Sequence, residues 1–201
     1  MALPWVCISP NVPRMILRWR IMQTLDPEEA YPRRRIAAID FSLEGFAVTA
    51  ERLRGVASAV GEGRIGVEVA GTGPNFAAAY TLGANRRFTL ASSEFEPDDN
   101  WRSQSVHEAV HAAFDLAGER PPSELDEAAA YLGETVWFRA GGLARTVRAP
   151  AAAAIHGAAN AVVARLALHT TLRQRVRRDQ VRELIAAING HPGYAPSAAG
   201  R

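Results

Sequence analysis

The sequence predicts an α+β protein in which a small mixed or antiparallel sheet of two to four strands is followed by a predominantly helical half. Two patterns predict this fold class. Residues 64–92 contain short segments in which apolar and polar residues alternate, as in half-buried strands. From residue 100 onward, apolar residues recur at helical spacing and alanine-rich stretches dominate. With 201 residues, of which 48% are hydrophobic, the chain is long enough to enclose one core.

Composition divides the chain into three parts. Residues 1–34 contain five prolines and lead into a basic run at 33–35. They are expected to form a poorly ordered lead-in, with at most a short helix around residues 15–22. Residues 35–192 are expected to form a single domain, and residues 193–201 a flexible tail.

The domain is predicted to begin with a helix at residues 42–60. Ser42 is a suitable N-cap, apolar residues follow it at helical spacing, and Gly61-Glu62-Gly63 ends the helix. The apolar positions are Phe46, Leu53, Val56 and Val60. Three strands are predicted next, at residues 64–70, 77–82 and 87–92, with turns at 71–75 and 83–85 and an acidic loop at 94–100.

Four helices are predicted after the sheet, at residues 100–117, 123–140, 150–169 and 172–189. Gly118 is positioned as a left-handed C-cap of the first helix. Two prolines then separate it from the second helix, which begins at Ser123. Asp126 lies three residues after Ser123, where it completes a capping-box-like start.

The composition also narrows the classes of function. No apolar run approaches the roughly 18 residues that span a bilayer. The single cysteine, Cys7, excludes a disulfide framework and a cysteine-based zinc finger. The short apolar stretch at residues 2–8 precedes the basic residues rather than following them, which is not typical of a signal peptide. This favours a cytoplasmic protein and leaves leaderless export open.

The formal charge of +2 does not indicate a nucleic-acid ligand. The chain contains no lysine and uses arginine throughout, together with much alanine and glycine. We interpret this pattern as a compositional bias of the coding sequence. The sequence carries no indication of oligomeric state.

The segment His107-Glu108-Ala109-Val110-His111 carries the strongest chemical signal. Histidines at positions i and i+4 project from one helix face, so both imidazoles can bind a single zinc ion at about 2.0–2.1 Å. Glu108 lies about 100° around the helix from His107, where it can act as general base toward a metal-bound water.

A second interpretation treats Ser105 and Glu108 as a helix-starting capping box in which the histidines are merely polar residues. It would start the helix at Ser105 and leave residues 101–104 unexplained. An apolar stripe beside the histidines favours a helix that is buried on one side and shows the imidazoles to a cleft. The stripe consists of Val106, Val110, Ala113 and Ala117.

On these residues the chain resembles the zincin metallopeptidases, and in particular small single-domain members in which a strand, the motif helix, a short turn and a glutamate helix follow one another. The resemblance covers about residues 64–140. It implies a minimal zincin-like architecture with one zinc ion per chain. In that group a glutamate on the next helix is the third ligand, and Glu127-Ala128 followed by Tyr131 matches its setting.

Helix geometry is consistent with this ligand set. An antiparallel return from Ser123 brings Glu127 near the level of His111, and Glu134 somewhat past His107. Glu127 is therefore the first choice as third ligand, beside His107 and His111, and Glu134 stays open as the second. Tyr131 is a candidate catalytic donor to an oxyanion, or else an aromatic residue packed between helices.

Four further residues are candidates for lesser roles. Asp115 could orient a histidine or lie exposed at the end of its helix. His156 could line the cleft or be a plain polar residue, while His169 and His191 are typical of helix ends. The strand at 87–92 is expected to border the cleft and to pair with an extended substrate.

These features predict a zinc-dependent metallohydrolase, a peptidase that cleaves peptide or protein substrates with Glu108 as general base. The alternative is a regulatory or toxin-related interaction protein that keeps the scaffold but acts by binding through the basic C-terminal helix. That helix would carry Arg173, Arg175, Arg177, Arg178 and Arg182. A third interpretation makes this basic run a solvated helix face.

Overall fold

A computed structural model describes residues 11–25, 33–69, 78–90, 99–143 and 150–194 of the chain. In this part the fold is α+β, with seven α-helices and two three-stranded mixed sheets, which confirms the predicted fold class. The helices are α1 (Asn11–Leu25), α2 (Arg33–Ala37), α3 (Ala50–Gly61), α4 (Asp99–Leu116), α5 (Ser123–Ala140), α6 (Pro150–Arg165) and α7 (Arg182–Asn189). The strands are β1 (Asp40–Leu43), β2 (Phe46–Thr49), β3 (Gly66–Val69), β4 (Ala78–Thr81), β5 (Arg87–Leu90) and β6 (Gln174–Val176).

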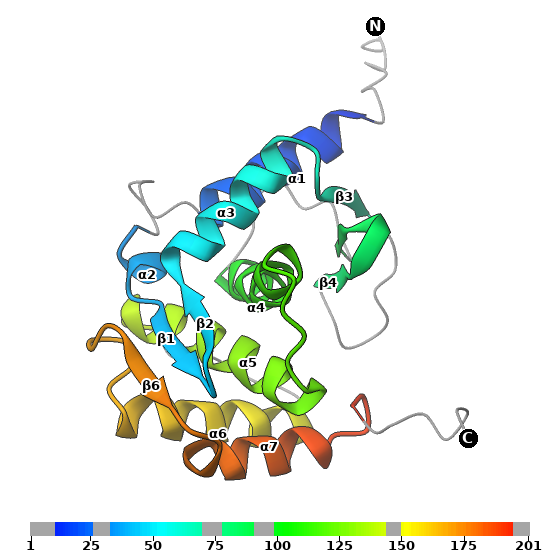
Figure 1. Cartoon of the computed structure of the whole chain (residues 1–201). Coiled ribbons are helices and arrows are strands. Elements are labelled where there is room, and N and C mark those ends of the chain that lie inside the picture. The colour runs from blue at the N-terminus through cyan, green and yellow to red at the C-terminus, as the bar shows by residue number, and fades with distance from the viewer. Residues whose placement is uncertain (1–10, 26–32, 70–77, 91–98, 144–149, 195–201) are drawn as a thin grey trace, which may run out of the picture.

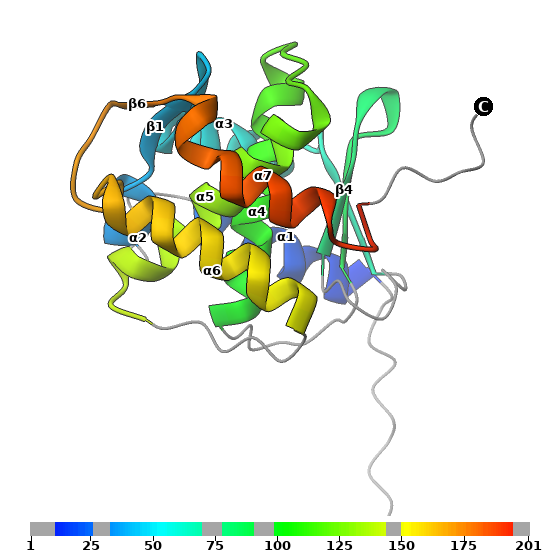
Figure 2. The same ribbon diagram turned by 90° about the horizontal axis from the view of Figure 1, so that it is seen from below.

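Helix α4 lies at the centre of the molecule, with other elements on several sides (Figure 1). It packs against α3, α5 and β4, while α6 and α7 cover α5 on the side away from α4 (Figure 2). The two predicted helices at 100–117 and 123–140 are thus confirmed as α4 and α5. One hydrophobic core includes buried residues from α1 through α7.

A β-hairpin replaces the first half of the helix predicted at residues 42–60. β1 and β2 pair in antiparallel register, with Leu43 opposite Phe46. The two-residue loop between them, Glu44-Gly45, has φ angles of 51° and 94°, which suit the primed turns that close tight hairpins. The helix begins at Ala50 instead, and the N-cap is Thr49, whose hydroxyl accepts a hydrogen bond from the Arg52 amide.

The predicted helix at residues 172–189 is also wrong in its first half. Residues 174–176 form β6, which pairs in parallel with β1 and completes the sheet β2-β1-β6. Only the second half is the amphipathic helix α7, after a 3₁₀ turn at Arg178–Val181. The helix predicted at 150–169 ends at Arg165.

The second sheet confirms the three predicted strands, in the order β3-β5-β4. β5 is the central strand, with Phe88 and Leu90 buried, and pairs in parallel with β3 and antiparallel with β4. β4 is therefore the edge strand on the side of α4. The sequence had predicted the strand at residues 87–92 in this position, at the border of the cleft. The predicted turn at 71–75 and most of the loop at 94–100 lie outside the described residues.

The lead-in predicted at residues 1–34 does not hold for α1. Leu17, Ile21 and Leu25 lie one turn apart along α1 and are buried in the common core. The Arg18 guanidinium donates a 2.8 Å hydrogen bond to the carbonyl of Val60 at the end of α3. This helix belongs to the domain, and residues 1–10 and 26–32 lie outside the described residues.

Among the described residues, no helix combines the length and the apolar character needed to cross a membrane.

Candidate metal centre

Helix α4 holds both histidines of the motif near its middle. It begins at Asp99, two turns before Ser105, so the capping-box interpretation of Ser105 is wrong. The Ser105 hydroxyl instead donates a 3.0 Å hydrogen bond back to the carbonyl of Trp101 within the helix. Val106 and Val110 are fully buried beside the histidines, as the apolar stripe predicted, whereas Ala117 is exposed.

Helix α4 ends at Leu116, and Gly118, which follows it, has a left-handed φ of +69°, as predicted for its C-cap. The chain then returns antiparallel in α5. The two helices approach closely where Gly133 faces Val110. A Cβ at Gly133 would lie 3.1 Å from a methyl carbon of Val110, so this position favours glycine. The capping box predicted at Ser123 is absent, since Pro122 is the N-cap and Ser123 lies in the helix.

Glu127 meets both histidines, as the sequence predicted. Its Oε2 lies 3.4 Å from Nε2 of His107, and its Oε1 lies 3.8 Å from Nε2 of His111. One ligand atom from each of the three residues lies within 4.8 Å of the others. Two imidazoles and one carboxylate are a ligand set that catalytic zinc sites use, with further coordination positions left for water and substrate.

Glu134, the second choice for a ligand, contacts the opposite nitrogen. Its Oε2 lies 3.5 Å from Nδ1 of His107, and its Oε1 accepts a 2.9 Å hydrogen bond from the Ser103 hydroxyl. The side chain is 2% exposed. Glu134 is therefore placed to orient His107 rather than to share an ion with it.

Asp126 has the same relationship to the second histidine. Its Oδ1 lies 2.7 Å from Nδ1 of His111. A carboxylate only accepts hydrogen bonds, so Nδ1 is the donor, and in the neutral imidazole the lone pair is on Nε2, facing Glu127. The sequence had given Asp126 a capping role and left Asp115 open as either a carboxylate that orients a histidine or an exposed residue; in the structure it is Asp126 that contacts a histidine.

The electrostatics of the cluster favour a cation. Burial alone would lower the pKa of His107, but Glu127 and Glu134 outweigh it and the pKa is well above its usual value. Burial also opposes protonation of His111, and Asp126 raises its pKa overall. Burial would raise the pKa of Glu127, yet the two histidines lower it. Oε2 of Glu127 is buried without a hydrogen bond in the described structure, so this cluster of lone pairs fits a metal ion.

A cleft of about 480 Å³ opens over the cluster, and Glu108 lines it together with both histidines and Glu127. Burial raises the pKa of Glu108, while the neighbouring histidines lower it. The edge strand β4 forms part of the wall with Ala78, Ala79 and Tyr80.

Tyr131 lies next to the cluster but is not among the residues that line the cleft in the described part of the chain. Its ring packs edge-on against His107, with 4.6 Å between the ring centroids. Its hydroxyl lies 2.9 Å from that of Tyr194, and it is Tyr194 that lines the cleft. A hydrogen bond from Tyr194 contributes to the lowered pKa of Glu127. The sequence had placed Tyr194 in the flexible tail, and no local motif marks it.

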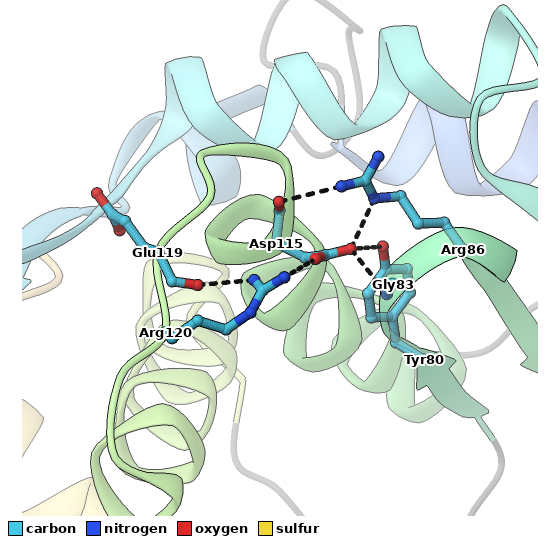
Figure 3. Close-up of polar contacts among 6 residues, drawn as sticks. All are labelled: Tyr80, Gly83, Arg86, Asp115, Glu119 and Arg120. Carbon is cyan, nitrogen blue, oxygen red and sulfur yellow. Dashed lines mark hydrogen bonds and ion pairs between the residues drawn. The ribbon is translucent and has the colours of Figure 1, made fainter.

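Asp115, near the C-terminal end of α4, is the buried centre of a network of polar contacts (Figure 3). Its side chain is 0% exposed and accepts hydrogen bonds from Tyr80 at 3.0 Å and from Arg86 at 2.6 Å. It also pairs with Arg120 at 2.9 Å, in the link between α4 and α5. Burial would raise the pKa of Asp115, but these donors lower it overall. Asp115 thus ties the cleft-lining strand β4 to the end of α4, and its side chain is bound to Tyr80, Arg86 and Arg120 rather than to a histidine of the motif.

The remaining histidines do not join the cluster. His156 packs against Tyr131 with 5.2 Å between ring centroids and lines a separate cavity, which His169 also lines. His191 follows α7, as expected of a helix-end residue, and its Nδ1 accepts a hydrogen bond from the Gly193 amide.

The basic segment of the alternative function is not one helix face. Arg177 pairs with Asp179 at 3.1 Å, and Arg178 pairs with Glu124 of α5 at 2.8 Å. Arg173 and Arg175 lie before and within β6, and only Arg182 begins α7. A binding role for this segment stays a prediction, without the helical surface on which it was based.

The site is therefore defined by the chain's own residues, which bring His107, His111 and Glu127 together beside Glu108. Comparisons with protein-family models, with curated proteins and with solved structures find no match for this chain.

Proposed function

We propose that the protein is a zinc-dependent metallohydrolase, a peptidase that holds one zinc ion between His107, His111 and Glu127. The observation that carries this proposal is the convergence of one ligand atom from each of the three residues to within 4.8 Å of the others, in the lining of a cleft. The resemblance of the motif and of its returning glutamate helix to the zincin metallopeptidases supports the peptidase assignment.

The ion, when bound, supplies a Lewis acid that polarises a scissile carbonyl and acidifies a water molecule. Glu108 lies on the cleft wall beside both histidines, where its carboxylate can take a proton from that water and return it to the leaving amine. Asp126 holds the His111 imidazole through its 2.7 Å contact with Nδ1, and Glu134 lies 3.5 Å from Nδ1 of His107, so both carboxylates are on the side of the rings away from Glu127.

Tyr194 replaces Tyr131 as the candidate oxyanion donor. Its hydroxyl reaches the cleft beside Glu127, and the Tyr131 hydroxyl at 2.9 Å holds it there. A phenol in this position can donate a hydrogen bond to the oxygen that becomes negative when a carbonyl is attacked. Tyr131 acts as a positioning residue through Tyr194.

The edge strand β4 supports an extended peptide as substrate. It pairs with β5 along one side only, and the sheet order β3-β5-β4 leaves its other side without a strand partner among the described residues. Ala78 and Ala79 line the cleft at this edge. A peptide laid along β4 can form main-chain hydrogen bonds with it while its scissile bond lies over the cluster.

Metal analysis and peptide cleavage test the proposal together. Protein purified without added zinc should contain about one zinc per chain, which should fall in the His111→Ala variant. Glu108→Gln should keep its zinc and lose cleavage of a quenched fluorescent peptide library by about 100-fold or more. Zinc-free wild-type protein that takes up none on titration, or full activity in Glu108→Gln, would contradict the proposal.

A further inference from the structure

A second cavity, of about 670 Å³, lies between the C-terminal half of α5 and the helix α6. Its described lining shares no residue with that of the metal cleft. The aromatic pair Tyr131 and His156 lies between the two, since Tyr131 contacts His107 on one side and His156 on the other. The cavity is thus a neighbour of the metal centre but not a part of it.

The two cavities differ in charge. Five acidic residues line the metal cleft, whereas the described lining of the second cavity contains none. It contains instead hydrogen-bond donors from three places in the chain: Thr135 and Arg139 on α5, His156 and Asn160 on α6, and His169 after α6. Such a lining favours a negatively charged ligand.

Two of these residues have hydrogen-bonding capacity that the described structure does not use. Arg139 donates a 2.7 Å hydrogen bond from one Nη atom to Asn160, which fixes the guanidinium. An arginine has five N–H groups, so others can donate to a ligand. Nδ1 of His169 is buried and has no hydrogen-bond partner in the described structure. A buried polar atom without a partner is costly, and a bound anion could supply that partner.

The rest of the lining indicates the size and nature of the ligand. Phe138, Leu143 and Ala153 provide an apolar part, so an organic anion fits better than an inorganic one. Gly157 also lines the cavity, and a Cβ built there would meet nothing within 4 Å. The space beside this helix position is therefore open to a ligand.

We infer that this cavity is a binding site for a small organic carboxylate, held by Arg139 and the two histidines with its apolar part against Phe138 and Leu143. The site is distinct from the proposed zinc centre and does not depend on it. A free carboxylic acid and an acidic side chain of a protein share this chemistry.

Phenylacetate and its uncharged analogue phenylacetamide are matched probes for this inference. Titrations are followed by chemical-shift changes in ¹⁵N-labelled full-length protein. Phenylacetate should bind with a dissociation constant on the order of 1 mM, and the amide about tenfold more weakly, because a charge-assisted hydrogen bond is lost. The peptide acetyl-Gly-Glu-Gly-amide tests whether an acidic side chain of a protein also binds. Binding of phenylacetate alone identifies a site for small molecules, and binding of both probes shows that the site also accepts acidic side chains.

Two variants locate the binding. Gly157→Phe fills the cavity from a position without steric conflict and should abolish binding, while Gly157→Ala, the matched control, should retain it. Arg139→Gln removes the cation but keeps a polar side chain, and it should weaken the binding of phenylacetate by about tenfold without affecting that of the amide. Equal binding of acid and amide, phenylacetate binding that persists in Gly157→Phe, or no saturable shift in the wild type would overturn the inference. Zinc content and peptide cleavage enter none of these measurements, so the outcome is separable from that of the proposed function.

Discussion

Asp126 contacts Nδ1 of His111 at 2.7 Å, while the next residue, Glu127, faces Nε2 of the same imidazole at 3.8 Å. Successive residues of α5 thus hold the two sides of one ring. Asp126 is placed to fix the orientation of the imidazole, and Glu127 is placed to bind the same metal ion as the imidazole.

Asp126→Asn should weaken zinc affinity by about 10- to 100-fold while saturating zinc still gives one ion per chain, because the variant loses the carboxylate that orients His111. Competition with a chromophoric chelator measures this change. Glu124→Gln is the matched control on the same helix, since Glu124 pairs with Arg178 and not with a histidine. Equal affinity in Asp126→Asn and wild type would contradict the assigned role.

Glu127→Gln and Glu134→Gln should separate the third ligand from its neighbour. Glu127 lies on the Nε2 side of both histidines, so its loss should leave substoichiometric zinc even with excess metal. Glu134 lies on the Nδ1 side of His107, so its variant should bind a full equivalent with lower affinity. The reverse result, with stoichiometry lost in Glu134→Gln only, would assign the ligand to Glu134.

Tyr194→Phe should lower kcat for peptide cleavage by about 100-fold with little change in KM, because the hydroxyl acts on charge that develops only during the reaction. Tyr131→Phe should have a smaller effect, about tenfold, since its hydroxyl acts through Tyr194. Zinc content should be unchanged in both. A larger loss in Tyr131→Phe than in Tyr194→Phe would reverse the two roles.

Asp115→Asn should destabilise the protein by about 2–3 kcal/mol at neutral pH, because Arg86 and Arg120 lose a buried counter-charge. Both arginines are partly exposed, which keeps the effect below that of a fully buried pair. The pKa of Asp115 is lowered in the folded state, so its contribution is fully present above the unfolded value of about 3.9 and disappears as the pH falls through the folded value. Urea unfolding of zinc-free protein between neutral and acid pH measures both. A stability difference that does not narrow toward acid pH would contradict this assignment.

Gly133→Ala should cost about 1–2 kcal/mol of unfolding free energy, since the new Cβ would lie 3.1 Å from Val110 and force α4 and α5 apart. Gly55→Ala is its control, because a Cβ there meets nothing within 4 Å and alanine favours a helix. Thermal unfolding of both variants measures the change in stability relative to the wild type. A stabilised Gly133→Ala protein would show that the helices have room to adjust.

Local pattern predicted those parts of the fold that local interactions determine. The strands at β3, β4 and β5 alternate clearly, and α4 and α5 have terminal glycines and prolines, so they were recognised. The hairpin is not predicted because Phe46 also fits a helical spacing with Leu53 and Val56, although Glu44-Gly45 is compatible with a turn. β6 pairs with β1 across more than a hundred residues, and no short segment contains that information.

The same distinction applies to the candidate site. Two histidines one turn apart on a helix are a local feature, and the return of α5 made Glu127 predictable as their neighbour. Whether Glu134 faces Nε2 or Nδ1 depends on side-chain direction across a helix pair. Tyr194 approaches from the far end of α7, so only the assembled structure places it beside Glu127.

The position of Tyr194 has a consequence for how the protein matures. During synthesis, a chain that has passed Gly142 already contains His107, His111 and Glu127 of the proposed metal centre, whereas Tyr194 follows later, after the end of α7. Under the proposed function, the zinc ligands are thus synthesised before the candidate oxyanion donor, and the complete site requires the chain through Tyr194.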